Sequence, residues 1–89
     1  MDLETANAAK ALANGLVKLD ERIAVLEAAI AGGWSITRVN LRDPLTATVY
    51  TVVDGAGEFD AELEQGLFAA ALQTLQAKRA ALADQLSRL

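Results

Sequence analysis

The sequence predicts a mainly α-helical α+β protein in which a β-hairpin separates two long helices. Three observations support this class: two stretches of heptad-spaced apolar residues, a Gly pair after the first stretch, and a Thr/Val-rich segment around the single Pro. The 89 residues suffice for one domain, 1–89, with a helix over about 3–31, a hairpin over about 34–53 and a helix over about 59–88. The two helices are expected to pack as an antiparallel, coiled-coil-like helical hairpin.

The first predicted helix has apolar residues at alternating spacings of four and three, which aligns them along one seam. The seam consists of Leu12, Leu16, Leu19, Ile23, Leu26 and Ile30. Gly32-Gly33 is expected to end the helix, because Gly adopts the left-handed conformation found after helix C-termini. Asn14-Gly15 lies inside the pattern, where two interpretations remain open: a tolerated Gly, or a kink or close helix contact.

The middle segment, Trp34 to Val53, is rich in β-branched and aromatic residues, which favour strands. Pro44 lacks the amide proton that a strand ladder needs, so Arg42-Asp43-Pro44 is expected to form a three-residue loop that pairs Leu41 with Leu45. That register puts on one face Val39, Leu41, Leu45, Ala47, Val49 and Val53. The opposite face then carries Trp34, Ile36, Arg38, Asn40, Thr46, Thr48, Tyr50 and Val52. The apolar face is expected to close over one end of the helices.

The second predicted helix has its own heptad seam, in which one member is charged. The seam consists of Phe68, Leu72, Leu75, Arg79, Leu82, Leu86 and Leu89. Acidic residues crowd the start of this helix, where its dipole favours negative charge, and Asp60 is expected to be the N-cap. The acids, interpreted as dipole matching and solubility, are Glu58, Asp60, Glu62 and Glu64. Aligning the two seams places Leu26 near Phe68, Leu19 near Leu75 and Leu12 near Leu82.

The composition excludes several classes of function. Without Cys or His there is no disulfide framework, no thiolate or imidazole metal site and no Ser-His-Asp triad, so neither an enzyme nor a cofactor is expected. A net charge of −4 without a basic tract disfavours general nucleic-acid binding. No apolar run approaches the ~18 residues of a membrane span, and the acidic N-terminus lacks the basic region of a signal peptide, so a cytoplasmic protein is expected.

The hairpin face that carries Arg38 combines a guanidinium, hydroxyls and aromatic rings. Such groups hold a small planar anion such as a nucleotide, or form a protein hot spot, or simply face solvent, and these three interpretations remain open. Arg79 is a further candidate, because a cation in an apolar seam either needs a partner, here Glu4 or Asp84 of another subunit, or extends to solvent at the edge of the seam. The candidate ligand- or partner-binding residues are Trp34, Arg38, Asn40, Arg42, Thr48, Tyr50 and Arg79.

Two narrow seams and a two-stranded ribbon bury little apolar surface in one chain. The half of the second hairpin face that carries Trp34, Ile36, Tyr50 and Val52 would stay wet in a monomer, unless one helix covers each face of the hairpin. Self-association through helix packing or sheet extension is therefore expected, and the chain is predicted to form a homo-oligomer.

The order of long helix, β-hairpin and long helix, with the Leu-rich end LQAKRAALADQLSRL, resembles small proteins encoded by phages and prophages of GC-rich bacteria. The lambda-type head–tail joining protein W shares this order with shorter helices and a more basic chain, and β-type prefoldin subunits share it with much longer coiled coils. The resemblance implies a non-enzymatic binding protein of the host cytoplasm, acting in counter-defence by sequestering a nucleotide signal or occluding a host immune protein. The alternative it implies is a virion or assembly protein that acts only through helix-mediated contacts.

Overall fold

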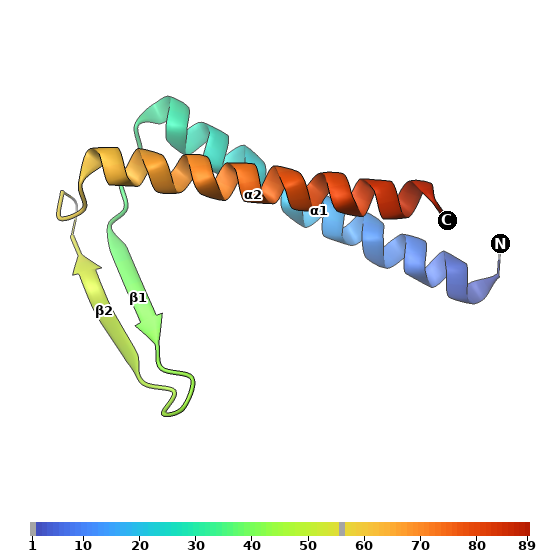
Figure 1. The fold of residues 1–89 in the computed structure, drawn as a ribbon, viewed down its shortest axis with the longest axis horizontal. Helices are drawn as coiled ribbons and strands as arrows, with labels where there is room; N and C mark the ends of the chain where they lie inside the picture. Colours follow the sequence, from blue (N-terminus) through green and yellow to red (C-terminus); the bar gives the residue numbers. More distant parts are fainter. Residues whose placement is uncertain (1, 56) are drawn as a thin grey trace.

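A computed structural model describes residues 2–55 and 57–89 and contains two long helices joined through an antiparallel hairpin (Figure 1). In chain order the elements are α1 (Leu3–Gly32), β1 (Arg38–Arg42), β2 (Val49–Asp54) and α2 (Ala61–Ser87). The two helices pack against each other and run in opposite directions, so the predicted mainly helical α+β class is confirmed.

Local sequence explains where α1 begins and ends. The Asp2 carboxylate accepts the Thr5 N–H at 2.7 Å, and this hydrogen bond lowers the pKa of Asp2 below its usual value. At the other end Gly33 has φ 64°, and the N–H groups of Gly33 and Trp34 both donate to the carbonyl of Ala29. The predicted Gly stop is therefore confirmed, and α1 continues unbroken through Asn14-Gly15.

The core of the molecule is the line along which α1 and α2 cross. Leu19 is 7% exposed and Ile23 is also buried, and most other apolar members of the two seams are half-buried. A Cβ at position 15 would lie 3.2 Å from Cδ1 of Leu82, so Gly15 marks a close helix contact. Leu82 thus lies against Gly15, about one turn from the predicted Leu12, whereas the predicted neighbours Leu19 and Leu75 line the same hollow between the helices.

The hairpin projects away from the helices, and this corrects the expectation that its apolar face covers one end of them (Figure 1). Among the described residues, β1 and β2 contact each other and neither strand packs on a helix. The molecule measures 53 × 37 × 14 Å, so its thinnest dimension holds only two crossed helices. The described residues leave both faces of the two-stranded sheet uncovered.

The predicted hairpin register is also wrong. The observed ladder pairs Arg38 with Asp54, Val39 with Val53, Asn40 with Thr51, Leu41 with Tyr50 and Arg42 with Val49. A bulge lies where the pairing passes from Val39 to Asn40, and Val52 is the extra residue on β2. Residues directly opposite each other share a face, so Tyr50 lies with Leu41 on the apolar face and Val49 lies with Arg42 on the polar one.

Hydrogen bonds of Asp43 explain the longer loop. Its carboxylate accepts the Leu45 N–H at 2.9 Å and its carbonyl accepts the Ala47 N–H at 2.8 Å. The Asp43 N–H donates to the carbonyl of Thr48 at 2.9 Å, which closes the loop before β2 begins. Ala47 adopts a left-handed φ of 60°, so the residues predicted to start the second strand lie in the loop.

We expect Leu19→Ala to lower the free energy of unfolding by at least about 2 kcal/mol, because it removes buried methyl groups where the helices cross. Val17→Ala is the matched control, since Val17 is exposed on the same helix and its loss should cost less than about 1 kcal/mol. Urea unfolding followed by circular dichroism measures both. Equal costs for the two variants would mean that the crossing is not the core.

Candidate functional site

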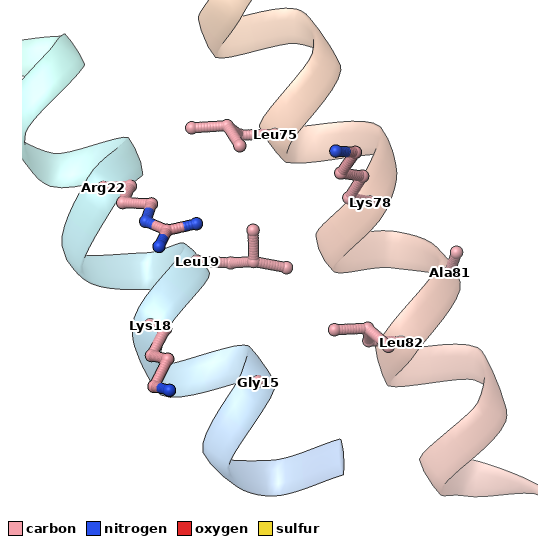
Figure 2. Close-up of a pocket in the computed structure, with 8 residues that line it drawn as sticks. All are labelled: Gly15, Lys18, Leu19, Arg22, Leu75, Lys78, Ala81 and Leu82. Carbon is pink, nitrogen blue, oxygen red and sulfur yellow. The ribbon is translucent and has the colours of Figure 1, made fainter. Parts of the chain in front are cut away.

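A groove runs along one side of the line where α1 and α2 cross. Leu19 points from α1 toward Leu75 and Leu82 of α2, and these three side chains form the apolar floor (Figure 2). Gly15 and Ala81 leave the floor open because they have little or no side chain. This part has a volume of about 410 Å³, and a second hollow of about 480 Å³ continues from it past Leu75 to Leu26.

Three cations rim the apolar floor of this groove: Lys18 and Arg22 on α1 and Lys78 on α2 (Figure 2). Lys18 and Arg22 are four residues apart on one helix, so they lie one turn above the other. None of the three forms an ion pair with a carboxylate of the described residues. In a chain of net charge −4, these three cations lie close together, and the acid Glu21 lines the adjoining hollow beside Arg22.

The other side of the crossing is closed by an ion pair. The Arg79 guanidinium donates to the Asp20 carboxylate, and this hydrogen bond, with the attraction of the two charges, raises the pKa of Arg79. Arg79 is thus paired within its own chain, which corrects the expectation of Glu4 or Asp84 in another subunit. Both side chains are about half-exposed, so the pair lies at the edge of the seam and contributes little to stability.

An apolar floor with a cationic rim suits an occupant that is itself apolar with acidic flanks. Aliphatic groups of such an occupant would be removed from water by packing on Leu19, Leu75 and Leu82, and its carboxylates would lie near the rim cations.

Within residues 2–55 and 57–89, no cluster of three acidic, His or Cys side chains is arranged to hold a metal ion. Neither helix of that part of the chain is long and apolar enough to cross a membrane.

The seven residues predicted as a site do not gather in one place. Arg38, Asn40 and Arg42 share the polar face of the hairpin, but Arg38 pairs with Asp54 at 3.4 Å and Asn40 accepts the Thr51 hydroxyl at 2.8 Å. The remaining four are Tyr50 on the opposite face, Thr48 in the loop bonded to Thr46, Trp34 at the end of α1, and Arg79 beside Asp20.

Trp34 lies back on the helix it follows. A Cβ at position 32 would be only 2.7 Å from the indole nitrogen of Trp34 and 3.0 Å from Cδ1. Gly32 is therefore required for this close approach, and the ring covers the last turn of α1. Its placement on the hairpin face, expected from the alternation of the strand pattern, is wrong because the residues between Gly33 and β1 are not paired as a strand.

The acidic residues before and within the first turn of α2 have structural roles beyond solubility. Asp60 caps the helix by accepting the Glu62 and Leu63 N–H groups, which confirms its prediction, and Glu58 accepts the Asp54 N–H at 2.8 Å. Glu64 is only 6% exposed, and its carboxylate accepts the Ile36 N–H. The positive end of the α2 dipole and that hydrogen bond make burial of this charge tolerable. Glu64 thus ties the chain leading into the hairpin to α2.

Sequence reasoning missed Lys18, Arg22, Lys78 and Glu64. A usable signal existed for the first two, because they are four residues apart beside the seam and next to Gly15. Lys78 could be added only once the crossing showed which side of α2 flanks the groove. No pattern in the sequence distinguishes Glu64 from its acidic neighbours.

We expect Glu64→Ala to lower the free energy of unfolding by about 1–3 kcal/mol, because the Ile36 N–H loses its acceptor in a partly buried place. Glu64→Gln keeps an acceptor oxygen and should recover most of that loss. Glu62→Ala is the control, since Glu62 is exposed in the same turn. Faster amide hydrogen exchange at Ile36 in Glu64→Ala alone identifies the lost bond; unchanged exchange would contradict this role.

Known proteins do not supply a role for these residues. Comparison of the chain with protein-family models, curated proteins and solved structures finds no match. The geometry of the groove and of the uncovered hairpin is therefore the basis for the functional argument.

Proposed function

We propose that this protein is a non-enzymatic, self-associating binding protein that acts through contacts with other proteins. The observation that most directly supports this proposal is the hairpin, which projects from the helices with an uncovered apolar face. Leu41 and Tyr50 on that face are each 57% exposed, and Leu45 at the tip is 94% exposed. Apolar residues presented in this way on a projecting element are typical of protein-contact surfaces.

The extended shape supports self-association. A compact monomer of this mass has an accessible surface of roughly 5000 Å², whereas this chain has 6551 Å². A compact chain of this length has a radius of gyration of about 12 Å, whereas the observed value is 17.3 Å. The surplus surface exceeds the ~800 Å² that each partner buries in a standard interface.

Of the roles implied by the phage resemblance, protein occlusion and assembly agree best with this geometry. Both act through protein contact, for which the projecting hairpin is suited. Sequestration of a nucleotide has less support, because the residues that would stack on a base and pair with a phosphate lie on different faces: Tyr50 lies opposite the strand face that carries Arg38 and Arg42.

We expect sedimentation velocity at micromolar concentration to give a species of at least twice the 9.4 kDa chain mass. The physical reason is that two crossed helices leave too much apolar surface wet for a stable monomer. A 9.4 kDa species at every concentration would contradict self-association. A thermal-shift screen with nucleotides complements this measurement, because a ligand that binds the folded chain stabilises it by RT ln(1 + [L]/Kd) and so raises the melting temperature.

We expect a photo-reactive amino acid at position 45 to crosslink this protein, in the cells that produce it, to a protein other than itself. Position 10 is the matched control, because Lys10 is exposed on α1 and remote from the hairpin. Crosslinks from position 45 only to the chain itself would limit the hairpin to self-association. Equal products from both positions, or a nucleotide-dependent thermal shift without specific crosslinks, would contradict a protein-contact function.

A further inference from the structure

The two-stranded sheet has two open edges, and its hydrogen bonds show which main-chain groups point outward from β2. The Asp43 N–H donates to the carbonyl of Thr48 at 2.9 Å, so these two residues face each other across the ribbon. In an antiparallel ladder, residues whose main-chain groups face the partner strand alternate with residues whose groups point away from it. Tyr50 therefore faces β1, whereas the N–H and C=O groups of Val49 and Thr51 point outward.

The far end of β2 follows the same alternation and closes its edge. The Gly55 N–H donates to the carbonyl of Thr37 at 2.7 Å, so Gly55 faces β1 and Asp54 before it points away. Glu58 accepts that outward Asp54 N–H at 2.8 Å. Among the described residues, the outward N–H groups of β2 that keep no partner are therefore those of Val49 and Thr51.

This short edge is uncharged and complementary to itself. No side chain from Val49 to Val53 carries a charge. A twofold axis through Tyr50, perpendicular to the sheet, sets Val49 opposite Thr51 of a second copy on both sides, so that every outward N–H meets a carbonyl. Tyr50 then lies opposite Tyr50 of the second copy, with Cα atoms about 4.5 Å apart, and the two rings pack on each other.

The β1 edge carries charges that oppose the same pairing. Its outward residues are Arg38, Asn40 and Arg42, because they lie opposite the outward residues of β2. The register that pairs the whole strand with a second copy sets Arg38 against Arg42 twice, and like charges directly opposite each other destabilise a sheet. Arg38 has only an exposed ion pair with Asp54 at 3.4 Å, and Arg42 has none among the described residues.

The β2 edge is also accessible. It forms the outer side of the projecting hairpin, and neither strand packs on a helix of the described chain (Figure 1). In an antiparallel pairing about Tyr50, the helices of the two copies lie at opposite ends of the combined sheet. The edge is therefore open to a second hairpin along the part that has free main-chain groups.

We propose that two copies of this chain associate through the β2 edge and form a four-stranded antiparallel sheet with Tyr50 at its twofold axis. The inference rests on the proposed self-association and adds the surface, register and symmetry that produce it. The apolar faces of the two hairpins, each with Leu41 and Tyr50, become one continuous face. That face and both tips stay free for contact with another protein.

Proline at an outward position tests the proposal. Thr51→Pro removes an N–H that points away from β1, so the hairpin keeps its own ladder while the edge is blocked. We expect dimerisation to weaken about tenfold or more. Asn40→Pro is the matched control and should leave the dimer unchanged, because it removes an outward N–H from the β1 edge and the same Thr51–Asn40 side-chain hydrogen bond. Sedimentation velocity across a wide concentration range measures both, with circular dichroism confirming that helix content is retained.

A single cysteine provides a second test that does not depend on how the hairpin tolerates proline. The chain has no Cys, so a disulfide in a single-Cys variant joins two copies. Tyr50→Cys should form this disulfide readily in a glutathione redox buffer, because Cα atoms about 4.5 Å apart suit the bond. Leu41→Cys is the matched control, since Leu41 is equally exposed on the same face but lies on an outer strand of the combined sheet. Non-reducing electrophoresis measures the dimer fraction.

The outcomes separate this interface from self-association in general. A dimer unaffected by Thr51→Pro, or one that Asn40→Pro weakens equally, would overturn the β2 edge and leave self-association standing. Equal disulfide yields from Tyr50→Cys and Leu41→Cys would also overturn it, and would decide the matter alone if Thr51→Pro disorders the hairpin. A monomeric wild-type protein would overturn both inferences.

Discussion

The close approach of α1 and α2 around Leu19 is the constraint on which the rest of the structure depends. Leu19 and Ile23 are buried there, and Gly15 allows Leu82 to come within van der Waals distance of the α1 backbone. Two further features follow from that contact: the groove is what the crossing leaves open on one side, and the Asp20–Arg79 pair closes the other. Because the helices cross instead of running side by side, the buried region is short, and only three apolar residues of the described chain are buried.

Heptad spacing, caps and glycines explain why the helices were predictable from sequence. These are local signals: Asp2, Asp60 and Gly33 determine helix ends through hydrogen bonds to residues a few positions away. The alignment of the two helices was predicted correctly for Leu19 and Leu75 but missed the partner of Leu82 by about a turn, because two seams with the same repeat fit together at several offsets. A single close contact, between Gly15 and Leu82, selects one of them.

The hairpin shows the limit of pattern reasoning more clearly. Alternation of apolar and polar residues predicts that faces exist, but loop length decides which residues share a face. Here the side chain and carbonyl of Asp43 draw Leu45 and Ala47 into the loop, and a bulge at Val52 changes the alternation again. The longer loop moved Tyr50 to the face opposite Arg38 and so separated the predicted site, whereas the bulge follows Tyr50 and affects only the residues after it. The basic groove had a local signal only at Lys18 and Arg22, because Lys78 comes from the other helix.

The link between the hairpin and α2 has a mechanical consequence. Among the described residues, Glu64 and Ile36 form a side-chain tie between that helix and the segment leading into β1, Glu58 accepts the Asp54 N–H at the end of β2, and neither strand packs on a helix. The hairpin is thus attached only at its base, about which it can rotate as a unit. Because a strand rises about 3.3 Å per residue, a swing of only about 10° at the base displaces Leu45 by roughly 4 Å. The tip can therefore adjust to surfaces of different shape while the helices stay still, and whatever holds Leu45 in place also sets the angle at Glu64.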